Sequence, residues 1–217
     1  IEEPDAAGHG YTPDSLPTYQ MVEKLDSVLH HFFNEARKLE QFEQIDFIVL
    51  SDHGMATYYP DNYVNLYDYL PIDSFRYVFE GTPTMLYPNE SYLETAYEKL
   101  QSVPNVTVYK RDEVPAQFVY GTNPRIADLI VLPDVGTAVQ LRAESSPKLG
   151  GAHGYDNFAP EMDAIFFAAG PSFKKGADFP IMANVNLYPL IALLLDLEPA
   201  PNDGDVELVK QLLNNDK

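Results

Sequence analysis

The sequence predicts an α/β fold in which a sheet carries helices on both faces and an α+β segment interrupts the core. Three features predict this fold. A helical repeat of apolar residues from Thr18 to Phe42 leads directly into the apolar run 45–50. A similar apolar run, 164–170, appears late in the chain. Between the two runs, the stretch 58–149 is rich in tyrosine and proline and contains short strand-like segments.

The first predicted element is an amphipathic helix over 18–42. Its apolar side chains recur every three or four residues, which is the spacing of one helix face. Asp14 and Ser15 stand before Pro17, where they supply capping and first-turn chemistry. The helix is therefore expected to begin close to this point.

The run 45–50 predicts a strand that is buried on both faces of a parallel sheet, because it is short, apolar and β-branched. Residues 51–55 then lie at the carboxyl end of that strand. Ligands of open α/β sheets bind at this edge. A functional site is therefore expected here.

The stretch 58–149 is predicted to be an α+β insertion into this core. Its expected elements are strands at 75–79, 84–87, 106–109 and 127–132, and a helix at 91–103 opened by a capping box of Ser91 and Glu94. After it, we expect a strand at 164–170 and helices at 185–195 and 206–213. The predicted division is a core part at 1–57, the insertion at 58–149, and the rest of the core at 150–217.

Composition excludes several classes of protein. Fourteen Lys and Arg stand against 33 Asp and Glu, and the formal net charge of −19 argues against a partner that is a nucleic-acid polymer. The absence of cysteine excludes disulfides, thiol nucleophiles and iron–sulfur clusters. No apolar run approaches the roughly 20 residues that a transmembrane segment needs. The start at Ile1, without an initiator Met or a signal peptide, suggests a cut inside a larger protein.

Three histidines stand beside glycine with carboxylates close by, and this pattern predicts a metal site. The groups are Asp5 with His9, Asp52 with His53, and His153. Imidazole and carboxylate are the ligands that a cysteine-free chain can offer to zinc, manganese or iron. Asp5 and His9 would share one face of a helix or lie in a loop around one ion. Pro4 and Gly8 favour the loop.

Each group also has an ordinary structural interpretation. Asp5 and His9 could be turn and capping residues, adjacent side chains such as Asp52 and His53 usually point apart, and His153 could be a loop residue without function. His30 and His31 lie in the middle of the predicted helix, and we interpret them as ordinary helix residues. The 15 tyrosines are interpreted as packing and surface residues of the insertion.

Three strings of residues, in order, resemble the nucleotide pyrophosphatase/phosphodiesterase family of the alkaline phosphatase superfamily. They are Glu-Pro-Asp-Ala-Ala-Gly-His-Gly-Tyr at 3–11, Ser-Asp-His-Gly-Met at 51–55 and Gly-Ala-His-Gly-Tyr-Asp-Asn at 151–157. The closing segments at 168–173 and 184–204 are similar to the family's last strand and helix. The resemblance therefore covers essentially the whole chain, as the C-terminal half of an alkaline-phosphatase-like catalytic domain.

The resemblance implies a centre of two divalent metal ions, zinc by family inference. Asp5, His9 and His153 match the ligands of one ion, and Asp52 and His53 match two ligands of the other. The family also needs a further Asp and a Thr or Ser nucleophile, both upstream of the matched segment, so no catalytic nucleophile is assigned in this chain. An upstream fragment of the same protein is the expected partner, and the chain alone is expected to lack turnover.

The implied activity is hydrolysis of a small phosphodiester or a nucleotide pyrophosphate bond through a covalent phospho-enzyme. Two alternatives stay open at this point. One is a phosphomonoesterase, phosphonate hydrolase or choline-phosphodiester hydrolase on the same metal centre. The other is a non-catalytic metal-binding module. The absence of cysteine resembles bacterial members more than disulfide-rich animal ectoenzymes, so a periplasmic or exported location is expected.

Overall fold

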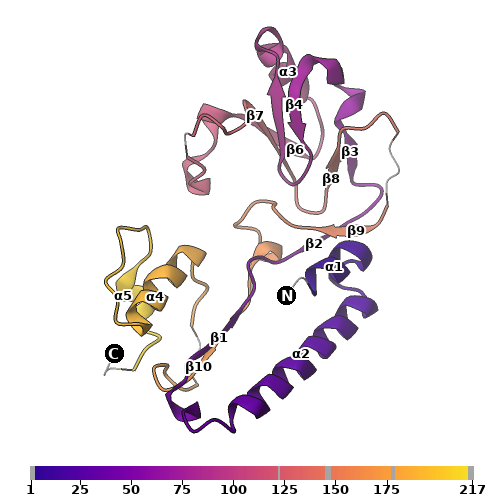
Figure 1. Ribbon diagram of the computed structural model, residues 1–217. Coiled ribbons are helices and arrows are strands. Elements are labelled where there is room, and N and C mark those ends of the chain that lie inside the picture. The colour runs from indigo at the N-terminus through magenta and orange to yellow at the C-terminus, as the bar shows by residue number, and fades with distance from the viewer. Residues whose placement is uncertain (1–2, 122, 145–147, 177–178, 215–217) are drawn as a thin grey trace. The chain divides into compact units, whose positions relative to one another are not determined.

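The computed structural model describes residues 3–121, 123–144, 148–176 and 179–214. The chain folds as two compact units, one from segments 1–28 and 52–164 and the other from segments 29–51 and 165–217. Helices and strands are mixed along the chain (Figure 1). The elements are α1 (Asp5–Tyr11), α2 (Leu16–Ala36), β1 (Phe47–Leu50), β2 (Ala56–Tyr58), β3 (Tyr63–Asn65), β4 (Phe75–Phe79), β5 (Thr84–Pro88), α3 (Leu93–Leu100), β6 (Val106–Lys110), β7 (Leu129–Pro133), β8 (Ala138–Gln140), β9 (Gly150–Ala152), β10 (Phe166–Ala169), α4 (Leu187–Leu194) and α5 (Val206–Lys210).

The first unit is built around an antiparallel sheet of four strands in the order β4-β5-β7-β6. Helix α3 covers one face of this sheet, because Ala96 and Leu100 of the helix pack with Leu86 and Val131 of the strands (Figure 1). These four side chains are fully buried. The strands at 75–79, 84–87, 106–109 and 127–132 are thus confirmed within two residues at each end.

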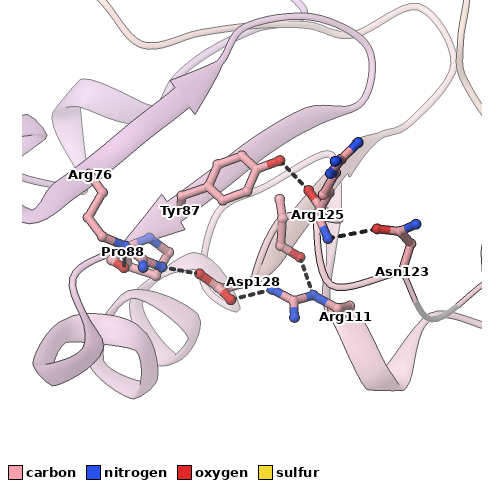
Figure 2. A network of polar contacts seen from close by, with 8 residues as sticks. Arg76, Tyr87, Pro88, Arg111, Asn123, Arg125 and Asp128 are labelled. Carbon is pink, nitrogen blue, oxygen red and sulfur yellow. Dashed lines mark hydrogen bonds and ion pairs between the residues drawn. The ribbon is translucent and has the colours of Figure 1, made fainter.

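A polar network fastens three parts of this sheet together (Figure 2). Asp128, just before β7, lies between two arginines, with 2.7 Å to Arg76 on β4 and 2.5 Å to Arg111 after β6. Arg76 sits where the β4–β5 pairing shifts register, and its Nε donates to the carbonyl of Pro88. The carboxylate therefore links both outer strands to the central strand β7.

Two shorter strand pairs complete the first unit. Strands β3 and β8 pair in parallel, and β2 and β9 pair antiparallel, with Ala56 opposite Ala152 and Tyr58 opposite Gly150. Helix α1 packs against β9. The division at residues 58 and 149 stays a prediction.

In the second unit, β1 pairs antiparallel with β10, and the apolar core lies among Phe173, Leu190, Val209 and Leu213. The strand predicted at 45–50 is present, but its parallel pairing and double burial are wrong for the described residues. Here β1 and β10 pair only with each other, and Leu50 of β1 is 43% exposed. An apolar run indicates a strand without indicating the direction of its partner.

Helix α4 lies within two residues of its predicted bounds and α5 ends at Lys210, three residues early, while α2 and α3 differ more. Helix α2 begins near the expected place, where Ser15 Oγ accepts the backbone N–H of Thr18 at 3.4 Å, but it ends at Ala36 instead of Phe42. Helix α3 begins at Leu93 and has no side-chain cap, so the capping box at Ser91 is wrong. In its place a 3₁₀ turn over Glu90–Tyr92 leads into the helix. No helix in the described ranges has the length and apolar character to cross a bilayer.

Candidate metal centre

The first two candidate ligands lie on helix α1. Asp5 is its first residue and His9 follows one turn later, which places His9 Nε2 3.4 Å from Asp5 Oδ1. The expectation of a loop is wrong here, although Pro4 does mark the helix start and its carbonyl accepts the N–H of Gly8 at 2.9 Å. An acidic residue in the first turn also suits the positive end of the helix dipole.

Gly8 is compatible with this helix because of what lies beside it. A Cβ atom on Gly8 would meet the Sδ of Met55, and a Cβ on Gly151 of β9 would overlap the carbonyl oxygen of Gly8. The two glycines therefore allow α1 and β9 to approach closely. Tertiary packing outweighs the low helix propensity of glycine at this position.

His153 reaches the same point from a distant part of the chain. It follows directly after β9, and its Nε2 lies 3.6 Å from Asp5 Oδ1. One ligand atom each from Asp5, His9 and His153 lies within 4.8 Å of the others. The structure thus brings together the three residues that the family resemblance assigns to one ion.

Backbone carbonyls orient two of the imidazole rings. His9 Nδ1 donates to the carbonyl of Gly151 at 2.7 Å, and His53 Nδ1 donates to the carbonyl of Gly54 at 2.8 Å. Since a carbonyl can only accept, Nδ1 carries the proton in both rings. The Nε2 lone pairs are then left for another partner, an arrangement typical of metal-ligating histidines.

Asp52 and His53 follow β1, and both lie in the first unit with the other candidates. His53 Nε2 is 3.6 Å from Asp52 Oδ2, and the His53 ring stacks on the His153 ring with centroids 3.6 Å apart. The Asp52 side chain is 86% exposed. All five candidates therefore gather at one place, with Asp52 and His53 beside the cluster of three.

The electrostatics of the cluster suit a cation. Burial lowers the pKa of His153 below its usual value, and the neighbouring His53 and His9 lower it further, against the opposing pull of Asp5 and Asp52. Asp5 Oδ1 is buried and accepts no hydrogen bond in the described structure. Burial of an unpaired carboxylate oxygen is costly unless a cation or donor compensates it.

The donor set matches zinc in both chemistry and size. Zinc binds imidazole nitrogen at about 2.0 Å in a tetrahedral arrangement, which separates neighbouring ligand atoms by about 3.3 Å. The separations from Asp5 Oδ1 to His9 Nε2 and to His153 Nε2 are 3.4 and 3.6 Å. Asp5, His9 and His153 are therefore residues that could hold one such ion between them.

Sequence reasoning missed two contacts made by residues next to the candidate ligands. Tyr155 is 4% exposed and its hydroxyl donates to the carbonyl of Thr137 at 3.0 Å. Burial raises the pKa of Tyr155 to about 12. The spacing of residues in the sequence indicates neither this hydrogen bond nor the one between His9 and the Gly151 carbonyl. The glycines at 150–154 are the one local signal near them.

Comparison with known proteins places these residues in a family. A family model described as type I phosphodiesterase/nucleotide pyrophosphatase matches residues 1–156. Human ectonucleotide pyrophosphatase/phosphodiesterase family member 5 is 33% identical over 215 residues, which are 99% of this chain and 45% of that protein. Human bis(5'-adenosyl)-triphosphatase is 34% identical over 214 residues, 98% of this chain and 47% of that protein.

Solved structures agree with this result. Human family member 5 superposes with a TM-score of 0.94 at 32% identity, over 98% of this chain and 57% of that chain. An inactive form of the murine member 5, in complex with AMP, superposes with a TM-score of 0.93 at 31% sequence identity, over 98% of this chain and 57% of that chain. The mixed α/β fold is therefore the alkaline-phosphatase-like fold of these relatives. The chain spans about half the length of the curated relatives, and it belongs to the type I phosphodiesterase/nucleotide pyrophosphatase family.

Proposed function

We propose that this chain supplies metal ligands to a hydrolase of phosphodiester or pyrophosphate bonds in small nucleotides. The observation that carries the proposal is that ligand atoms of Asp5, His9 and His153 lie together, and that the Asp5 oxygen Oδ1 among them is buried without a hydrogen bond. Cations at this position would offset the negative charge of the phosphate substrate that a hydrolase of this family binds. The ectonucleotide names of the relatives support an enzyme that acts outside the cytoplasm, in the periplasm or after export.

One divalent ion is assigned to Asp5, His9 and His153. Asp5 Oδ1 and His9 Nε2 lie 3.4 Å apart, and the hydrogen bond from His9 to Gly151 holds that ring in place. The acidic oxygen offsets part of the ionic charge, and the two imidazoles stay neutral when they ligate. Zinc is the ion that this set of nitrogen and oxygen donors fits.

A second ion is assigned to Asp52 and His53. Two ligands do not complete a site, and we assign the remaining ligands to residues outside these 217. The Thr or Ser nucleophile of the proposed covalent phospho-enzyme is assigned to the same outside segment, an upstream part of the same protein. When bound, two such ions supply positive charge for the phosphoryl oxygens and lower the pKa of an attacking hydroxyl or water.

The substrate class follows from charge and from the relatives. The murine relative holds AMP and another relative is named for bis(5'-adenosyl) triphosphate, so a nucleotide is the proposed substrate. The net charge of −19 repels long polyanions, whereas a small substrate needs only the local positive field of the ions. Cleavage of long duplex DNA at physiological salt would contradict this part of the proposal.

The test is metal analysis of the full-length protein together with hydrolysis of a chromogenic nucleotide phosphodiester. We expect two zinc ions per chain in the wild type, loss of one ion and of activity in Asp5→Asn and His9→Ala, and no change in His30→Ala. His30 is a matched control because it is an exposed histidine on α2. Zinc without any activity on diesters, with turnover of phosphate monoesters or choline phosphodiesters, would move the assignment to those substrates. Full metal content in Asp5→Asn would refute the ligand set.

A further inference from the structure

The loop that carries His153 is fastened at the residue two positions later. Tyr155 is 4% exposed, and its hydroxyl donates a hydrogen bond to the carbonyl of Thr137 at 3.0 Å. This bond joins two residues that are 18 positions apart in the sequence. Thr137 is itself 2% exposed. The bond is therefore shielded from water on both sides, where a side-chain hydrogen bond holds its geometry best.

The acceptor of this bond lies on a well-defined turn. The N–H of Thr137 donates to the carbonyl of Asp134 at 2.9 Å, and Gly136 between them has a φ of +82°. Strand β8 begins at the next residue and pairs with β3. The Thr137 carbonyl is thus fixed by regular structure, not by a free loop.

A second contact holds the residue between His153 and Tyr155. Gly154 has a φ of +91°, and a Cβ atom there would overlap the carbonyl oxygen of Thr82 in the β4–β5 turn. Only glycine combines this backbone conformation with such a close approach. The three-residue segment 153–155 therefore lies in close contact with Thr82 and is hydrogen-bonded to Thr137.

We propose that Tyr155 is a positioning residue that holds His153 in ligand geometry through its hydrogen bond to Thr137. The proposal rests on the metal centre proposed above. His153 Nε2 lies 3.6 Å from Asp5 Oδ1, close to the separation that a shared zinc requires, and no hydrogen bond to its Nδ1 orients the ring in the described structure. His9 and His53 each have such a bond to a carbonyl, whereas the His153 ring is placed by its backbone and by stacking on the His53 ring. Tyr155 fixes that backbone from two residues away.

A purely structural tyrosine would give a different result, and the chain offers a matched control. Tyr87 in the same unit also donates its hydroxyl to a backbone carbonyl, that of Arg125 at 2.9 Å (Figure 2). Tyr155→Phe and Tyr87→Phe each remove one hydroxyl and one hydrogen bond of the same kind. Only Tyr155→Phe disturbs the segment that carries His153.

The experiment measures zinc affinity and the rate of zinc release for the full-length protein, with zinc ion alone as the probe and a chromophoric chelator as competitor. His153→Ala identifies the zinc ion that depends on this ligand. We expect Tyr155→Phe to weaken that ion's binding about tenfold and to accelerate its release, as loss of a supporting residue does. Tyr87→Phe is expected to bind and release zinc like the wild type. Circular dichroism checks that each variant is folded.

The outcomes separate the two proposals. Wild-type affinity in Tyr155→Phe, with loss of the ion in His153→Ala, would overturn the positioning role and leave the metal centre standing. Wild-type affinity in His153→Ala would refute the metal centre itself. If Tyr155→Phe does not fold, Gly136→Ala displaces the acceptor turn while Tyr155 stays intact, and it is expected to weaken zinc binding in the same way. Unchanged zinc binding in a folded Gly136→Ala would contradict the inference.

Discussion

Replacement of Gly151 by alanine tests the close packing on which the candidate metal centre depends. A Cβ atom at this position would overlap the carbonyl oxygen of Gly8 and would lie 2.7 Å from Met55 Sδ. The methionine can move its flexible end, but the carbonyl belongs to helix α1 and moves only with it. Relief of the overlap therefore requires α1 and β9 to separate by several tenths of an ångström or more.

Two effects follow from this separation. Overpacking of a buried position lowers the free energy of unfolding by about 1–3 kcal/mol. The same movement displaces His9 and Asp5 from His153, and a ligand set that is about 1 Å too wide loses much of its affinity. We therefore expect Gly151→Ala to bind zinc at least tenfold more weakly than the wild type.

Gly10 provides the matched control, because it lies on the same helix and a Cβ there meets nothing within 4 Å. Gly10→Ala should leave zinc binding unchanged and should stabilise the helix by up to about 1 kcal/mol. Urea unfolding followed by circular dichroism measures both variants, since the chain has no tryptophan for fluorescence. A Gly151→Ala protein with a wild-type urea midpoint and wild-type zinc affinity would refute the reasoning.

Three further predictions concern pH and charge. Because burial raises the pKa of Tyr155 to about 12, the contribution of this residue to stability is complete below pH 10, and about 3 kcal/mol is lost as the pH rises to 12. In thermal unfolding between pH 9 and 12, Tyr155→Phe should therefore lose less stability than the wild type. An equal decline of stability with pH in the two proteins would argue against the raised pKa. The pKa of His153 is lowered in the folded chain, so in the absence of metal its protonation favours the unfolded state. The stability of the metal-free chain is then complete above pH 6.5 and declines as the pH falls through the lowered pKa. His153→Gln should make this decline smaller in melting curves recorded from pH 8 to 5. Asp128→Asn should lower the free energy of urea unfolding by about 1–2 kcal/mol, because it leaves Arg76 and Arg111 without their shared carboxylate. The control Glu35→Gln removes an exposed ion pair with Lys38 and should lower it by less than about 0.5 kcal/mol. Equal costs for these two variants would contradict the importance of the Asp128 network.

Most elements were predictable because their signals are local. The hairpin of β4 and β5 and the strands β6 and β7 alternate or cluster apolar residues between turn residues, and β1 ends directly before the Ser-Asp-His-Gly string. The five candidate ligands were found from their glycine context and family resemblance, and the structure brings them together in one unit.

The errors arose where a distant contact decides the local conformation. Gly8 argued for a loop around Asp5 and His9, but the space that it leaves for Met55 and Gly151 is what allows α1 to pack as a helix. The capping box at Ser91 failed for a local reason instead, since the chain enters α3 through a 3₁₀ turn over Glu90–Tyr92. Local preference is a weak predictor wherever tertiary packing supplies more energy.

Strand β9 explains why three histidines from separate parts of the sequence share one site. The carbonyl of Gly151 in β9 accepts the ring N–H of His9, and β9 ends directly before His153. Its partner β2 follows His53, whose ring stacks on that of His153. A slip of one residue in the β2–β9 pairing would turn each side chain to the opposite face and would misalign the histidines together. The glycines of β9 thus serve the site as much as the ligands do, because Cβ atoms at Gly150 and Gly151 would meet the backbone of α1 and keep His9 from the Gly151 carbonyl.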